Sequence, residues 1–244
     1  MTPSTTLTAT IEPFDSFWEA PENIEKGYSS FAKFYKSNYL KYVPPQKRSR
    51  ILVISCGPGY FVNVLVQEGY TNVLGIDSFE EKVKYAQQRN LNCRTEQAFP
   101  FLQANQEPYD LIFCEQELNH LTKEEMLVFL KLCWDNLEER GILIVHGLNG
   151  ANPITGAEAL AQNFDHYNTF TEYALRQVLR HSNFEGITVI PLNLYVFYLN
   201  PLNYLLMALD TVYTLFFKFS FALYGKSNRI FTKKIAAICR KGSL

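Results

Sequence analysis

The stretch Ile51-Leu-Val-Ile-Ser-Cys-Gly-Pro-Gly-Tyr60 decides the fold. Its first residues, 51–55, form a short apolar run that suits a parallel strand covered on both faces. Gly57 and Gly59 follow at once, and without a Cβ they let backbone amides approach a ligand closely. A helix predicted over 59–69 points its free amides and positive dipole end at the same place. The stretch therefore predicts a ligand site at the carboxyl end of a parallel strand.

Strands and helices alternate after this point. The strands are predicted at 51–55, 73–77, 93–96, 111–115, 142–145, 186–190 and 233–239. Helices are predicted over 59–69 and 80–89, and a third runs from a capping box of Thr122 and Glu125 to Gly141. A fourth begins at Thr171, its predicted N-cap. Strands separated by helices imply an α/β fold with a Rossmann-like doubly wound, mostly parallel sheet.

The composition is that of an ordinary globular protein. The chain has 244 residues, of which 47% are hydrophobic and 19% charged, which favours a single domain. A net charge of -1 gives no global reason to bind nucleic acid. The five cysteines form no C-x-x-C pair and have no histidine at zinc-ligand spacing, so no metal site is predicted. With no signal-peptide pattern at the N-terminus, we expect a cytoplasmic protein.

Asp77 strengthens the case for a ligand at the glycine turn. It ends the second predicted strand, twenty residues after Gly57, where a carboxylate can accept hydrogen bonds from both hydroxyls of a ribose. A dinucleotide fold would need a third glycine for the pyrophosphate, and this chain has Val62 there. The pattern favours an adenosine-type cofactor that lacks a pyrophosphate.

Three segments in this order resemble the class I S-adenosylmethionine-dependent methyltransferase family. They are ILVISCGPGYF from position 51, VLGIDSFEEKVKYAQQR from position 73, and YDLIFCEQELNHLTKEEMLVFLKLCWDNLEERGILIVHG from position 109. The similarity covers about residues 50–190, with the last strand beyond it. The resemblance implies a seven-stranded sheet whose last strand is antiparallel, and S-adenosyl-L-methionine as the cofactor.

The resemblance also implies roles for individual residues. The loop beneath the methionine part would be Ser55, Cys56, Gly57 and Gly59. Asp77 would hold the ribose, Ser78 and Phe79 would flank the adenine, and Glu115 would lie under the sulfonium. Further adenine contacts would come from Glu96, Gln97 and Ala98. The chain departs from the family at Val53, where an acidic residue is usual, and at Ser55, where the first glycine is usual.

Two histidines are predicted as the base that takes the acceptor's proton, because the unperturbed pKa of histidine lies near neutrality. His120 follows the fourth strand, where relatives often carry Glu-His and this chain has Asn119-His120. His166 precedes the helix after the fifth strand, in a segment that resembles the substrate mouth of sugar-modifying relatives, and Asp165 could orient it. The resemblance suggests O-methylation of a sugar hydroxyl in a surface polysaccharide or lipid-linked glycan. A natural-product or quinone-like small molecule and a non-catalytic scaffold stay open.

An apolar insertion, residues 192–228, separates the sixth and seventh strands. Its polar residues Asn203, Asp210, Thr214 and Lys218 line one stripe of a helix with a wide apolar arc opposite. Three interpretations remain: packing on the domain's own sheet or in a homodimer, membrane-surface contact through 192–225 at the inner face of the membrane, and a true span. We divide the chain into an N-terminal helical cap (14–42), a core (50–191), the insertion (192–228) and the last strand (229–241).

Overall fold

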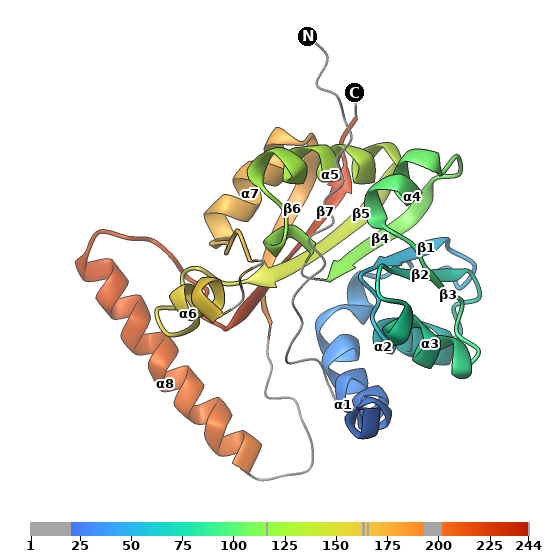
Figure 1. Ribbon diagram of the computed structural model, residues 1–244. Helices are drawn as coiled ribbons and strands as arrows, with labels where there is room; N and C mark the ends of the chain where they lie inside the picture. The colour runs from blue at the N-terminus through green and yellow to red at the C-terminus, as the bar shows by residue number, and fades with distance from the viewer. Residues whose placement is uncertain (1–20, 116, 163, 165, 193–201, 244) are drawn as a thin grey trace.

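The computed structural model describes residues 21–115, 117–162, 164, 166–192 and 202–243. Within them a seven-stranded sheet has the order β3-β2-β1-β4-β5-β7-β6 (Figure 1). The strands are β1 (Ile51–Ile54), β2 (Val73–Asp77), β3 (Cys93–Thr95), β4 (Tyr109–Glu115), β5 (Leu137–Leu148), β6 (Phe184–Leu192) and β7 (Lys234–Lys241). The last strand, β7, is antiparallel to both β5 and β6, whereas β1 is parallel to β2 and β4. The predicted mostly parallel sheet with an antiparallel last strand is confirmed.

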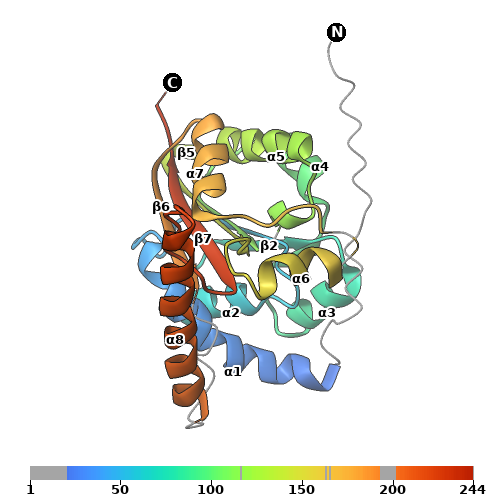
Figure 2. The ribbon, with the colours of Figure 1, turned by 90° about the vertical axis from the view of Figure 1, so that its left-hand side faces the viewer.

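Helices cover both faces of the sheet (Figures 1 and 2). The α-helices of the described residues are α1 (Pro21–Asn38), α2 (Tyr60–Gln67), α3 (Glu80–Gln88), α4 (Ala98–Ala104), α5 (Lys123–Asp135), α6 (Thr155–Gln162), α7 (Glu172–His181) and α8 (Leu202–Leu223), of which α8 does not cover the sheet. Two short 3-10 helices, η1 (Leu40–Tyr42) and η2 (Glu117–Asn119), complete the set in the described residues. Strand residues alternate between two cores: Val53 and Phe113 face α1, α2 and α3, whereas Ile54 and Cys114 face α4, α5 and α7. Both faces of the central strands are therefore buried, as the apolar run predicts.

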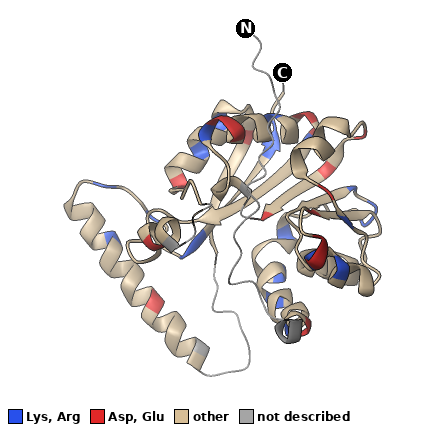
Figure 3. Ribbon diagram, in the orientation of Figure 1, with Lys and Arg blue, Asp and Glu red and all other residues tan. Residues whose placement is uncertain are grey.

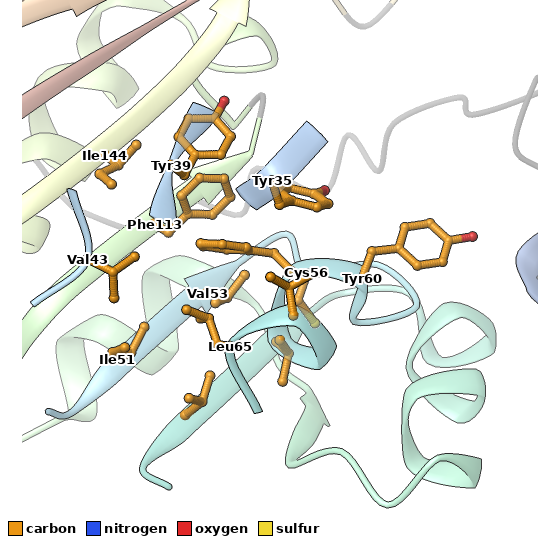
Figure 4. Packing of buried hydrophobic residues seen from close by; sticks show 14 of the residues in the cluster. Tyr35, Tyr39, Val43, Ile51, Val53, Cys56, Tyr60, Leu65, Phe113 and Ile144 are labelled. Atoms are coloured by element: carbon orange, nitrogen blue, oxygen red, sulfur yellow. The ribbon is translucent and has the colours of Figure 1, made fainter. Parts of the chain in front are cut away.

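Aromatic side chains fix α1 over the carboxyl ends of the strands. The ring of Tyr35 stacks on Phe61 with centroids 4.9 Å apart, and the ring of Tyr39 meets Phe113 edge-on at 4.9 Å. Figure 4 shows Tyr35 and Tyr39 beside Phe113, with the Tyr39 hydroxyl pointing away from Val53. Burying an aromatic side chain of this size contributes roughly 1.5–3 kcal/mol. These contacts hold α1 against the carboxyl ends of β4 and β5.

The predicted boundary between α5 and β5 is wrong. The capping box at the start of α5 is present, but the helix ends at Asp135 and not at Gly141. Asn136 stops it, because its side-chain amide donates to the carbonyl of Leu132 at 2.9 Å. Leu137, whose side chain is buried, is the first residue of β5 and pairs with Tyr109 of β4. Packing of one leucine in the sheet outweighs the helical pattern that continues to Gly141.

The insertion between β6 and β7 contains α8, which stands apart from the sheet and its covering helices in Figure 1. Within the described residues, Tyr204–Leu223 is the one helical stretch long and apolar enough to cross a membrane by length and composition. None of that stretch is buried inside the protein. The interpretation in which the domain's own sheet covers the helix does not hold. The start of the insertion, 193–201, lies outside the described residues.

Candidate cofactor and acceptor site

The turn after β1 runs through three residues in the left-handed backbone region. Ser55, Gly57 and Gly59 have φ values of 56°, 53° and 81°. A Cβ on Gly59 would lie 3.0 Å from Ala86, so close packing against α3 requires glycine there. At Gly57 no described atom lies within 4 Å of the Cβ position, which leaves open space above this peptide. Ser55 takes the left-handed conformation without being glycine, so the departure at this position leaves the shape of the turn intact.

Asp77, the last residue of β2, holds this turn in place through hydrogen bonds. One carboxylate oxygen accepts the amide of Gly57 at 2.8 Å, and the other accepts the amide of Phe79 at 2.9 Å. The side chain is fixed at the carboxyl edge and only 9% of the residue is exposed. A carboxylate oxygen accepts more than one hydrogen bond. Asp77 can therefore hold the turn and still receive a hydroxyl from a ligand.

The predicted adenine residues gather beside Asp77. Phe79 is the N-cap of α3, and the amide of Glu96 donates to the carbonyl of Asp77 at 3.0 Å. Glu96 and Gln97 are exposed, and Ser78 is partly buried. Ala98 begins α4, a helix that the sequence pattern did not predict. The structure thus brings these residues together at the ends of β2 and β3.

Val62 occupies the position of the missing third glycine. A Cβ placed on Gly75 of β2 would lie 3.0 Å from the Val62 side chain and 2.9 Å from the Cys56 sulfur. The glycine that permits close packing of helix and strand is therefore on the strand in this protein. Cys56 is buried and serves this packing, while its amide donates to the carbonyl of Ile76 at 3.0 Å.

Glu115, at the end of β4, belongs to a buried polar cluster that sequence reasoning did not identify. Its carboxylate accepts the Tyr35 hydroxyl at 2.5 Å and lies 3.6 Å from Nε2 of His146. The other ring nitrogen of His146 is 2.8 Å from the Tyr39 hydroxyl. A usable signal was present, because Glu115 ends one predicted strand and His146 directly follows the next, 142–145, and the two residues pair in the sheet. The Glu115 side chain remains 24% exposed, so the cluster opens to the site on one side.

Burial controls the charges of this cluster. It raises the pKa of Glu115, against the opposing effect of the Lys234 ammonium. It lowers the pKa of His146 well below its usual value, and Lys234 lowers it further. His146 is accordingly neutral at physiological pH. When the Tyr39 hydroxyl donates to Nδ1, the proton of the ring lies on Nε2, which faces the Glu115 carboxylate.

The neutral state of His146 predicts a pH-dependent stability. As pH falls through the ordinary histidine pKa near 6.5, the unfolded chain binds a proton that the folded protein does not. We expect the free energy of unfolding to lose about 1.4 kcal/mol from this residue between pH 7.5 and 5.5. Urea denaturation at both pH values should show that loss in the wild type and not in His146→Gln. Glu115 is present in both proteins, so its opposite contribution cancels, and an equal loss in the variant would contradict the assignment.

The two predicted catalytic histidines lie against each other. The ring centroids of His120 and His166 are 4.7 Å apart, with the rings inclined by 58°. Nδ1 of His166 is 2.7 Å from the carbonyl oxygen of Ala159 in α6. Because a carbonyl only accepts, Nδ1 carries the proton of this contact. Asp165, predicted to orient His166, lies outside the described residues, and Ala159 provides an orienting contact instead.

Asn119 joins the two histidine segments. It is fully buried, its side chain accepts the amide of Leu148 at 3.2 Å, and it donates to the carbonyl of Asn168 at 2.5 Å. Its own carbonyl accepts the amide of Tyr167 at 2.9 Å. An asparagine both donates and accepts, which a carboxylate at this position could not do. The residue that departs from the resembling family's glutamate therefore ties the His166 segment to β5.

The profile of a protein family described as a methyltransferase domain matches residues 28–189. No curated protein sequence gives a significant match. A SAM dependent methyltransferase from Archaeoglobus fulgidus has a similar structure, with 16% identity and a TM-score of 0.64, over 91% of this chain and 100% of the other.

Two further solved structures are similar. Phosphoethanolamine N-methyltransferase 2 from Haemonchus contortus, in complex with S-adenosyl-L-methionine, is 13% identical with a TM-score of 0.60, over 96% of this chain and 61% of the other. Magnesium protoporphyrin IX methyltransferase from Synechocystis PCC 6803, with bound SAM, is 16% identical with a TM-score of 0.53, over 91% and 83%. At these identities the likeness shows a shared fold.

Proposed function

Since the chain belongs to the family of methyltransferase domains, we propose that it transfers the methyl group of S-adenosyl-L-methionine to a hydroxyl group of a small-molecule or glycan acceptor. One observation carries the proposal. The carboxylate of Asp77 accepts the Gly57 amide at 2.8 Å and so holds the open glycine turn in place. This arrangement offers free space over backbone amides and a fixed carboxylate at one edge of the sheet. Those are the features that an adenosine-type cofactor without a pyrophosphate requires.

Each part of the cofactor has a residue suited to it. The turn of Ser55, Gly57 and Gly59 would take the methionine part, and Asp77 would accept the ribose hydroxyls. When bound, the cofactor supplies a methyl group on a positively charged sulfonium. Glu115 places a carboxylate at the same edge, and an opposite charge nearby stabilises a cation. The Tyr35 hydroxyl holds that carboxylate in one orientation through a 2.5 Å hydrogen bond.

We propose His166 as the base for the acceptor, with His120 in contact with it. An alcohol must lose a proton as it attacks a methyl group, and a positioned imidazole can take that proton. The Ala159 carbonyl fixes the ring of His166 in the tautomer that leaves Nε2 basic. A sugar hydroxyl, in a surface polysaccharide or a lipid-linked glycan, is the acceptor that we propose. A cytoplasmic location fits the five cysteines, all of which are buried and none of which forms a disulfide within the described residues.

Calorimetric titration with two cofactor forms tests the proposal. We expect the wild type to bind both S-adenosylmethionine and its demethylated product, which lacks the sulfonium charge. Glu115→Gln should weaken binding of the charged form about tenfold, roughly 1.4 kcal/mol, and leave the product within about twofold. Glutamine retains an acceptor for Tyr35, so the change isolates the charge.

Glu107→Gln provides the matched control, because Glu107 is an exposed carboxylate, 80% accessible, before β4 at the opposite edge of the sheet. Equal weakening of both cofactor forms by Glu115→Gln would show that Glu115 supports the fold of the site and not its charge. If the wild type binds neither form at millimolar concentration, the protein is a non-catalytic scaffold and the proposed reaction is wrong.

A further inference from the structure

The helix α8 exposes apolar side chains of the kind that an ordinary surface helix buries. Asp210, Thr214, Phe217 and Phe221 lie on the partly buried side. The rings of Phe217 and Phe221 meet the buried ring of Phe231, with centroids 6.0 and 4.8 Å apart. The opposite side faces solvent with side chains that are 57–69% exposed, namely Leu205, Val212, Leu215, Phe216, Phe219 and Leu223. We call these six residues the outer arc.

The outer arc belongs to a purely apolar surface. At 3.6 residues per turn, it and its apolar neighbours cover roughly 140° of the helix without a polar side chain. A surface helix normally buries such an arc and exposes its polar side. The charged residues of α8 are Asp210 and Lys218, and the rest of the helix is drawn in tan in Figure 3, apart from the part drawn in grey. An apolar surface of this extent on a folded chain marks a contact with something outside the domain.

The charged residues that follow Asp210 in the chain are all basic. Residues 211–244 contain no Asp or Glu, although the whole chain has a net charge of -1. The cations in this part are Lys218, Lys226, Arg229, Lys233, Lys234, Arg240 and Lys241. Four of them, Lys218, Lys226, Arg229 and Lys233, are exposed on or just after the last turns of α8. Glu172 of α7 touches this segment, where it accepts the Arg229 amide at 3.1 Å.

We propose that α8 lies in the interface of an anionic lipid bilayer, with the outer arc in the acyl region and the four basic residues at the lipid phosphates. Tyrosines stand at both ends of the helix, where Tyr204 is 69% and Tyr224 is 84% exposed. Tyrosine favours the level of the lipid headgroups, because its ring is apolar and its hydroxyl polar. Apolar arc, basic flank and aromatic ends together are typical of a helix lying in the membrane plane.

The connections of α8 argue against a transmembrane span. Leu192, before the helix, pairs directly with Lys234, after it, so the chain leaves and re-enters the sheet at one point. The helix is about 33 Å long, close to the hydrocarbon thickness of about 30 Å. A span would send one connection of nine or ten residues back across the hydrocarbon as backbone with unpaired polar groups, at several kcal/mol for each group. A helix in the interface needs no such crossing.

Docking through α8 would bring the candidate site to the membrane. The insertion leaves the sheet at the carboxyl end of β6, where Lys234 pairs with Leu148 at the carboxyl end of β5. Glu115 and the histidine pair follow strands that end at the same edge. If the proposed function is right, this orientation suits a hydroxyl acceptor carried on a membrane lipid. The docking surface itself does not depend on the reaction.

Flotation with lipid vesicles tests the docking surface without cofactor or acceptor. We expect the wild type to float with vesicles of phosphatidylcholine and phosphatidylglycerol, and to bind vesicles of phosphatidylcholine alone at least tenfold more weakly. The double variant Phe216→Asp, Phe219→Asp should bind the anionic vesicles at least tenfold more weakly than the wild type. Both side chains are exposed, at 61% and 65%, so the variant should fold, and a circular dichroism spectrum and melting temperature equal to those of the wild type check that it does.

Val66→Asp is the control for an added carboxylate elsewhere on the surface, because it replaces an aliphatic side chain that is 47% exposed on α2 and adds one of the two negative charges that the double variant adds. It should bind vesicles as the wild type does. Equal flotation of wild type and double variant would overturn the proposal, as would no flotation of the wild type. A wild-type dimer in sedimentation equilibrium without lipid, made monomeric by the double variant, together with absent flotation, would assign the outer arc to a second copy of this chain.

Discussion

Asp77→Ala is expected to weaken S-adenosylmethionine binding by at least about 100-fold, or about 2.7 kcal/mol. The variant removes two proposed hydrogen bonds from ribose hydroxyls to a charged acceptor, each of which contributes about 1.5–3 kcal/mol. It also releases the Gly57 amide, which the carboxylate accepts at 2.8 Å, so the turn itself loosens. Calorimetric titration of the purified variant measures the effect.

Asp110→Ala is the matched control for this experiment. Asp110 lies at the opposite end of β4 and its carboxylate accepts the Arg50 amide at 2.7 Å, so both variants lose a bond between a carboxylate and a backbone amide. We expect the control to lose stability and to keep wild-type affinity for the cofactor. Unchanged affinity in Asp77→Ala would refute the ribose assignment. A similar loss in both variants would attribute the effect to a weakened fold.

Most of the fold predictions that the structure confirms depend on residues that are close together in the chain. The apolar run of β1 and the glycine turn need only neighbouring residues to be recognised, and β2 has the predicted bounds of Val73–Asp77. The capping box of α5 depends on Thr122 and Glu125, which are three residues apart in the chain. Where the signal lies within a few residues, the sequence is sufficient.

The predictions failed where distant contacts decide the structure. The end of α5 depends on Asn136, whose side chain also donates to the carbonyl of Leu102 at 2.9 Å. The start of α6, a helix that the sequence pattern does not predict, depends on Asn152, whose side chain accepts the amide of Thr155 at 3.0 Å. The role of His146 depends on Tyr39, 107 residues away in the chain. No periodicity reports such contacts.

The histidine pair shows the same division within the candidate site. Each histidine was a candidate because of its position after a strand, which the sequence gives directly. The contact between the rings of His120 and His166 depends on Asn119, whose side chain holds the second segment through the carbonyl of Asn168. The departure from the resembling family's glutamate is therefore part of what forms the pair.

His166→Ala is expected to lower turnover by about 100-fold to 10,000-fold while cofactor affinity stays within about twofold of the wild type. The variant removes the imidazole that would take the acceptor's proton. Transfer of a tritiated methyl group measures turnover, with the best acceptor from a panel of glycosides, lipid-linked sugars and hydroquinones. The panel also decides between a sugar hydroxyl and a quinone-like acceptor.

His120→Ala should lower turnover less, because His120 acts through its contact with the ring of His166, 4.7 Å away between centroids. His181→Ala is the matched control, since His181 is exposed at the end of α7 and should keep full turnover.

Added imidazole should restore part of the activity of His166→Ala, because a free base can enter the space that the side chain leaves. Restoration would distinguish a missing base from a damaged site. Full activity in both His120→Ala and His166→Ala would remove the histidine pair from the reaction and leave the acceptor's proton to another group, for which the buried cluster around Glu115 is the next candidate.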